Sequence, residues 1–123
     1  MPLKTLVLGA SSNPERYSNK AIKLLSKYGH PVVAIGNKED KVDSIQIHTG
    51  FPEFKDVDTV TLYLGPSNQN GFYNYILQCK PRRIIFNPGT LNPELISLAK
   101  ENGILVIEAC TLVMLNTGQF EMN

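Results

Sequence analysis

The sequence has few of the residues that cross-link a fold through disulfide bonds or bound metal ions. It contains no tryptophan and only two cysteines among its 123 residues. These cysteines, Cys79 and Cys110, stand far apart, without a CxxC pair and without a histidine at ligand spacing. The pattern argues against a zinc site or a disulfide framework, so we expect two free thiols.

Clustered charge and long apolar runs are also scarce. The net charge is +1, with 12 basic and 11 acidic residues, and the longest basic run is Arg82-Arg83. Nucleic-acid-binding and membrane-surface proteins carry denser basic patches, so we expect neither partner. No apolar run approaches a membrane span, and the first four residues lead at once into a short strand, without the apolar region of a signal peptide. We therefore expect a cytoplasmic protein.

Apolar segments alternate with helical patterns along the rest of the chain. With 42% hydrophobic and 19% charged residues, the sequence can form one globular domain spanning residues 1–123. Strands are expected at 4–9, 31–36, 57–64, 83–87 and 104–107, and residues 45–47 fit a short edge strand. This alternation predicts a three-layer, doubly wound α/β fold with a five-stranded parallel sheet in the order 3-2-1-4-5.

The first apolar segment ends at Gly9 in a loop of small residues, ahead of a helix expected over 18–28. Gly9 can adopt a positive φ, and the small residues let backbone N–H groups approach an anion. Arg16 can hold phosphate oxygens with two parallel hydrogen bonds, although an ordinary turn with a solvated arginine is the alternative. Two of the three glycines of the dinucleotide fingerprint are absent, because Ser11 and Pro14 occupy their positions.

Loops after other strands should lie beside this one, because the carboxyl ends of parallel strands meet at one edge of the sheet. Asn37 and Lys38 follow the second strand, where a nicotinamide dinucleotide site places a carboxylate; the acidic pair 39–40 comes just after them. Lys38 suits a ligand with an extra phosphate, or is a solvated loop charge. In the stretch 87–89 after the fourth strand, Gly89 either lets the backbone approach a pyrophosphate or forms a simple turn.

The first loop resembles the signature of the small bacterial CoA-binding proteins, which are similar to the CoA-binding domain of the succinyl-CoA synthetase α subunit. The matching stretch is Gly9-Ala10-Ser11-Ser12-Asn13-Pro14-Glu15-Arg16-Tyr17-Ser18-Asn19, and the similarity continues through Asn37-Lys38, Asn87-Pro88-Gly89 and Glu108-Ala109-Cys110. The third loop of that family commonly carries an arginine and a proline, whereas Leu64-Gly65-Pro66 here lacks the arginine. The resemblance implies a Rossmann-like fold that binds CoA or an acyl-CoA. The ligand-binding residues that it implies are Gly9, Ala10, Ser11, Ser12, Arg16, Ser18, Asn37, Lys38, Asn87, Pro88 and Gly89.

No catalytic constellation accompanies these loops. His30 and His48 have neither a carboxylate nor a serine at a diagnostic spacing, and Cys110 lacks an activating base. We therefore predict a non-catalytic CoA-binding or regulatory module. An NAD(P)-binding oxidoreductase-like protein, acyl transfer through Cys110, and a subunit that completes a site on a partner chain stay open as alternatives, as does a homo-oligomer.

Overall fold

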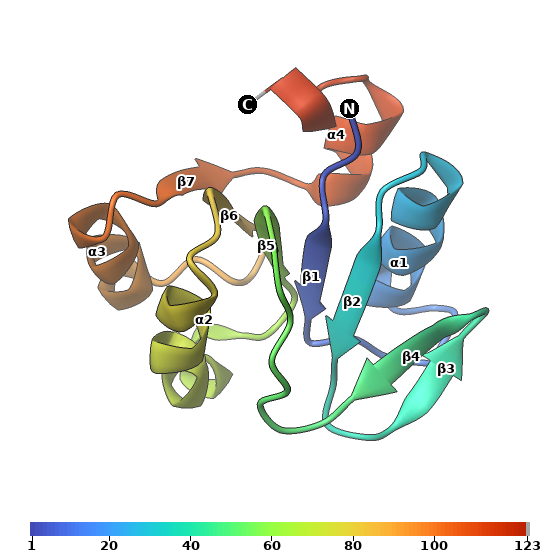
Figure 1. Ribbon diagram of the computed structural model, residues 1–123, viewed down its shortest axis with the longest axis horizontal. Coiled ribbons are helices and arrows are strands. Elements are labelled where there is room, and N and C mark those ends of the chain that lie inside the picture. The colour runs from blue at the N-terminus through green and yellow to red at the C-terminus, as the bar shows by residue number, and fades with distance from the viewer. Residues whose placement is uncertain (123) are drawn as a thin grey trace.

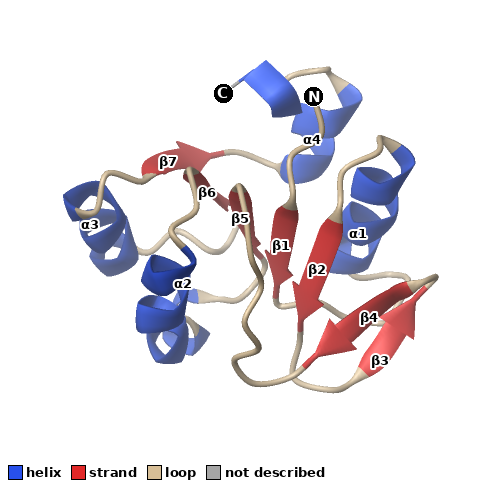
Figure 2. Cartoon of the chain, in the orientation of Figure 1, coloured by secondary structure: helices blue, strands red, loops and turns tan. Residues whose placement is uncertain are grey.

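The computed structural model describes residues 1–122, which form a central sheet with helices on both faces (Figures 1 and 2). The strands are β1 (Thr5–Leu8), β2 (Val32–Ile35), β3 (Asp40–Val42), β4 (Ile45–His48), β5 (Thr59–Leu62), β6 (Arg83–Phe86) and β7 (Leu105–Glu108). The α-helices are α1 (Tyr17–Lys27), α2 (Tyr73–Cys79), α3 (Pro93–Glu101) and α4 (Thr111–Asn116). Short 3-10 turns span Pro66–Asn68, Asn70–Phe72 and Phe120–Met122. None of the helices described is long and apolar enough to cross a membrane.

The sheet order is β3-β4-β2-β1-β5-β6-β7, and every strand pair is parallel except β3 with β4. The predicted Rossmann-like α/β fold is confirmed, but the prediction of five parallel strands in the order 3-2-1-4-5 is wrong. The expected edge strand at 45–47 is β4, which pairs with β2 and so occupies the outer side of that strand. The third expected strand, β5, pairs instead with the free side of β1.

The hairpin of β3 and β4 makes the sheet mixed and moves its edge to β3. The two strands pair antiparallel, from Asp40 opposite Ile47 to Val42 opposite Ile45. Asp43 in the connecting turn has a φ of 54°, a left-handed conformation that aspartate tolerates better than most residues. β3 has only three residues, two of them charged and exposed, so it offers no alternation from which a strand could be predicted.

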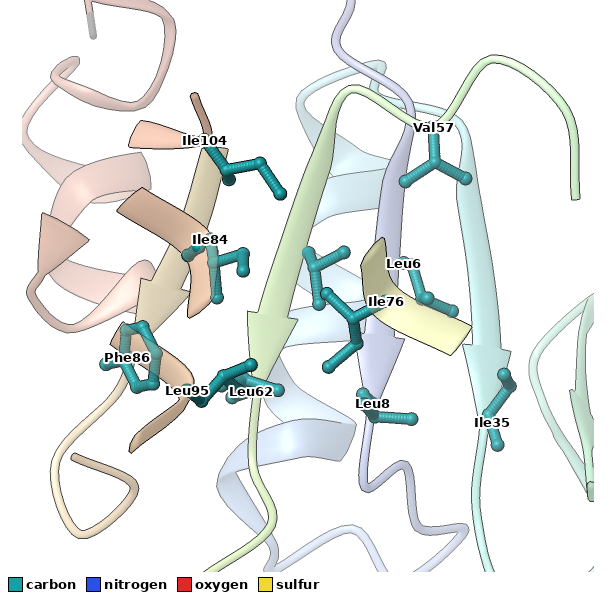
Figure 3. Close-up of a cluster of buried hydrophobic side chains, with 12 residues drawn as sticks. Leu6, Leu8, Ile35, Val57, Leu62, Ile76, Ile84, Phe86, Leu95 and Ile104 are labelled. Carbon is teal, nitrogen blue, oxygen red and sulfur yellow. The ribbon is translucent and has the colours of Figure 1, made fainter. Parts of the chain in front are cut away.

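Alternate side chains of the strands enter two separate hydrophobic cores. One face packs against α2 and α3 through Leu6, Leu8, Leu62, Ile76, Ile84, Phe86 and Leu95 (Figure 3). The other face packs against α1 and α4 through Val7, Ile22, Leu25, Ala34, Ile85, Met114 and Leu115. Burying each of these side chains larger than alanine stabilises the fold by about 1.5–3 kcal/mol. The chain is therefore arranged in three layers, with α1 and α4 on one side of the sheet and α2 and α3 on the other.

The direction of winding reverses between β1 and β5. From β1 the chain moves outward through β2 to β4, whereas from β5 it moves the opposite way through β6 to β7. The loop after β1 enters α1 on one face, and the loop after β5 leads to α2 on the other face. In such sheets the two loops diverge and leave a crevice at the carboxyl ends of the strands.

The N-terminus and the turn Phe120–Met122 meet at the other end of the sheet (Figure 1). The Met1 amino group forms an ion pair with the Glu121 carboxylate. The buried Phe120 ring lies under Arg83, whose guanidinium carbon is 4.4 Å from the ring centroid, and beside His30, with ring centroids 4.8 Å apart. These contacts fix the C-terminal turn against the amino ends of the strands.

Candidate functional site

A cavity of about 420 Å³ opens at the carboxyl ends of the strands, where the loops after β1, β2, β5 and β6 meet. Of the residues predicted from the sequence, it is lined by Gly9, Ala10, Ser11, Arg16, Ser18, Asn37, Pro88 and Gly89. The lining also includes Tyr17, Tyr63, Leu64, Gly65 and Thr90. Segments widely separated in the sequence are thus brought to the crevice that the winding of the sheet creates.

The N-terminus of α1 enters this cavity without a cap. Arg16 is the N-cap residue and forms no side-chain cap hydrogen bond, and the first turn of α1 contains no acidic residue. At α3, in contrast, the Oδ1 atom of Asn92 accepts hydrogen bonds from the backbone N–H groups of Glu94 (3.1 Å) and Leu95 (3.5 Å). An uncapped helix N-terminus presents N–H groups and a partial positive charge, so a bound anion could take the place of the missing cap.

Two glycines allow the backbone segments around the cavity to approach closely. Gly9 has a φ of +101°, and a Cβ atom there would lie 2.9 Å from the carbonyl carbon of Tyr63. At Gly36, at the end of β2, a Cβ atom would lie only 2.4 Å from the carbonyl oxygen of Ala10. A side chain at either position would push the loop after β1 away from its neighbours. The sequence predicts a role for Gly9 from its place in the loop, whereas it indicates Gly36 only as the end of a strand.

Asn87 lies beneath the cavity and not in its lining. Its buried side chain donates through Nδ2 to the Thr61 hydroxyl (2.7 Å) and to the Leu62 carbonyl oxygen (2.8 Å). Its Oδ1 atom accepts from the backbone N–H of Thr111 (2.8 Å). Asn87 thus joins the ends of β5, β6 and α4, which supports the floor of the site.

Ser12 and Lys38 also lie outside the cavity lining, on the exposed surface beside Asp40. A hydrogen bond from the backbone N–H of Lys41, a second from the Ser12 side chain and the nearby charge of Lys38 hold the pKa of Asp40 below its usual value. Asp40 therefore joins the loop after β1 to the start of β3. Its carboxylate does not enter the cavity.

A second cavity, of about 330 Å³, adjoins the first on the α2 side of the sheet. Gly9, Asn37 and Leu64 line both cavities, and the remaining lining of the second is Leu8, Ile35, Gly36, Asn68 and Phe72. The Phe72 ring packs against the exposed Phe51 ring, with centroids 5.1 Å apart. Apolar and aromatic groups here could cover the face of a planar ring. Phe72 is not among the ligand-binding residues predicted from the sequence.

The titratable groups of the cavity lining suit anion binding better than acid–base chemistry. Arg16 is the cation, and no Asp, Glu, His or Cys of the described residues lines either cavity. Burial raises the pKa of Tyr63 to about 12, so its phenol stays protonated at neutral pH. His30 is buried at the other end of the sheet, where its Nδ1 atom accepts from the backbone N–H of Leu3 (3.0 Å). Cys110 is a half-buried free thiol outside both linings.

The sequence of residues 4–116 matches the model of the CoA-binding domain. The chain belongs to this family. The CoA-binding domain shares 47% sequence identity with the crystal structure of an uncharacterized protein, over 98% of this chain and 99% of that chain, with a TM-score of 0.95. No curated protein matches the sequence significantly.

Two more distant structures share the fold of this CoA-binding domain. A hypothetical protein from Pyrococcus horikoshii OT3 is 21% identical over 92% of this chain and 81% of that chain, with a TM-score of 0.84. The protein cell-free ID.343 from Thermus thermophilus is 20% identical over 97% and 91%, also with a TM-score of 0.84. The arrangement of strands and helices described above is therefore shared by chains whose sequences have diverged widely.

Proposed function

We propose that this CoA-binding domain binds CoA or an acyl-CoA in the crevice formed by the two adjoining cavities. The observation that carries the proposal is the uncapped N-terminus of α1, which enters the larger cavity beside Gly9 and Arg16. The pyrophosphate of CoA would receive hydrogen bonds from the backbone N–H groups at this terminus and from the Arg16 guanidinium. A cation and a helix N-terminus would then face the same anion.

The remaining parts of CoA extend from the pyrophosphate in opposite directions. The adenine would lie in the smaller cavity, because Leu64 and Phe72 provide apolar surface and the two glycines in its lining leave space beside them. The pantetheine would follow the loop after β6 in the larger cavity, along Pro88, Gly89 and Thr90. Lys38 is exposed next to Asn37, which lines both cavities, so its ammonium could reach the extra phosphate on the ribose of CoA.

We propose a binding or regulatory role and not catalysis by the isolated chain. Hydrolysis or transfer of an acyl group needs a base close to the thioester, and the described lining of both cavities supplies no histidine or carboxylate. The Tyr63 phenol could donate a hydrogen bond to a bound ligand, but its raised pKa makes it a poor base at neutral pH.

Isothermal titration calorimetry with CoA and with NAD⁺ tests this function. We expect CoA to bind at least about tenfold more tightly, equivalent to about 1.4 kcal/mol. Lys38 favours the extra phosphate, which NAD⁺ lacks, and no carboxylate among residues 1–122 lines either cavity to bind the ribose of NAD⁺. Mass spectrometry of ligand released from the purified native protein provides a second, independent measurement. Tighter binding of NAD⁺ than of CoA would overturn the assignment of the ligand.

A further inference from the structure

Gln69 lies between two 3-10 turns in the connection from β5 to α2, and its side chain is entirely buried. Its Nε2 atom donates to the Leu64 carbonyl oxygen at 2.8 Å and to the Thr90 carbonyl oxygen at 2.7 Å. Leu64 follows β5 and Thr90 follows β6, and both residues line the larger cavity. One amide group therefore joins two walls of the crevice.

The oxygen of the same amide is also used. Its Oε1 atom accepts from Nδ2 of Asn92 at 3.0 Å, and that nitrogen also donates to the Tyr73 hydroxyl at 2.8 Å. The Tyr73 hydroxyl in turn donates to the Glu94 carboxylate at 2.9 Å. Through these bonds the starts of α2 and α3 fix the orientation of the Gln69 amide.

An amide is the side-chain group that these surroundings require. Two carbonyl oxygens converge on one nitrogen, while a donor approaches the oxygen, and a glutamine amide supplies two donors and an acceptor. A methionine at position 69 would fill the space but leave both carbonyl oxygens without this donor. An ionised glutamate would direct an oxygen at them.

We infer that Gln69 is a positioning residue that sets the width of the larger cavity and thereby the affinity for the pantetheine half of CoA. The inference rests on the proposed function. Gln69 lines neither cavity and is 0% exposed, so it acts on the ligand through Leu64 and Thr90. The smaller cavity includes Leu64 but no residue of the loop after β6, so its shape depends less on this connection.

Two ligands separate a positioning role from a general loss of structure. Gln69→Met is titrated with CoA and with 3′-phospho-ADP, the nucleotide part of CoA that lacks pantetheine. We expect CoA to bind about tenfold more weakly or worse, and the nucleotide to lose less than about threefold. Equal losses for the two ligands, or no loss for CoA, would overturn the inference.

Gln46 provides a matched control for this substitution. It is a half-buried glutamine in β4 whose Nε2 donates to the Ile47 carbonyl oxygen at 3.0 Å, and it lines neither cavity. Gln46→Met should bind CoA with wild-type affinity. A wild-type protein that does not bind CoA at all would refute the proposed function. Wild-type affinity in Gln69→Met would refute the positioning role alone.

A second variant makes the test independent of how well the methionine variant folds. In Gln69→Glu an ionised carboxylate would face two carbonyl oxygens, whereas the protonated form could donate to one of them. We expect its CoA affinity, divided by that of wild type, to rise severalfold as the pH falls from about 8 to about 6, because such a site raises a carboxyl pKa. A ratio that does not change with pH would contradict the proposed role of the two donors.

Discussion

Replacing Arg16 by alanine removes the cation at the N-terminus of α1 and should weaken CoA binding strongly. Arg16 is exposed, lines the larger cavity and forms no ion pair with any residue of the range 1–122. A hydrogen bond between charged partners contributes about 1.5–3 kcal/mol, which corresponds to roughly a tenfold to hundredfold loss of affinity. The melting temperature of the unliganded protein should change little, because exposed substitutions of this kind usually alter stability by less than about 0.5 kcal/mol.

Arg82 supplies the matched control for this measurement. Its guanidinium binds Asp58 through Nε (2.9 Å) and Nη2 (3.1 Å), just before β6 and at the opposite end of the sheet from the cavity. Arg82→Ala should therefore bind CoA like wild type when both variants are titrated by calorimetry. Arg16→Lys should recover only part of the affinity, because an ammonium lacks the planar fork of the guanidinium.

Salt dependence shows whether the Arg16 contribution is electrostatic. The difference between wild type and Arg16→Ala should shrink when the salt concentration is raised from about 0.1 M to about 0.5 M. Unchanged CoA affinity in Arg16→Ala at the lower concentration would refute the reasoning. Arg16 would then be a solvated loop residue, and the phosphate site would lose its cation.

Four further outcomes are expected. Lys38→Ala should weaken binding of CoA but not of dephospho-CoA in parallel titrations, and equal losses for both would contradict a contact with the extra phosphate. Gly36→Ala should destabilise the protein by roughly 1–3 kcal/mol in urea unfolding and weaken CoA binding, because its Cβ would lie 2.4 Å from the Ala10 carbonyl oxygen. Burial lowers the pKa of His30, so this histidine binds a proton more readily in the unfolded chain than in the folded protein. The free energy of unfolding should therefore fall as the pH drops through about 6.5. A His30→Gln variant should lose less stability over the same pH range. Cys110→Ser should bind CoA normally, and thiol-release assays should detect no acyl-CoA turnover by the wild-type protein; sustained release that the substitution abolishes would show that the thiol is catalytic.

The strands and helices that could be predicted are those whose apolar residues follow a clear pattern along the sequence. β1 and β6 are buried at every position, and α1 places Ala21, Ile22 and Leu25 on one face at helical spacing. β3 could not be found in this way, because Asp40 and Lys41 are exposed and the strand exists only by pairing with β4. Missing this hairpin led to the wrong sheet order, since β4 takes the place beside β2 that the third predicted strand was expected to occupy.

Among the residues predicted for the candidate site, two glycines have a backbone conformation that the sequence indicates. Gly9 and Gly89 follow strands and adopt positive φ values of 101° and 87°, in line with the turns expected from the sequence. The direction in which a side chain points cannot be predicted from the sequence in this way. Asn87 belongs to the same motif as Gly89, yet its amide hydrogen-bonds to the neighbouring strand of the sheet. The part played by Gln69 could not be read locally either, because it depends on two carbonyl groups from loops that meet only after folding.

The pairing of Met1 with Glu121 has a practical consequence for handling the protein. The N-terminus and the turn Phe120–Met122 lie together beyond the amino ends of the strands (Figure 1). The larger cavity lies at the carboxyl ends. A tether attached at Met1 therefore emerges from the side opposite the larger cavity. The protein could be immobilised on a sensor surface through such a tether with the larger cavity facing the solution, which suits kinetic measurements of the proposed CoA binding.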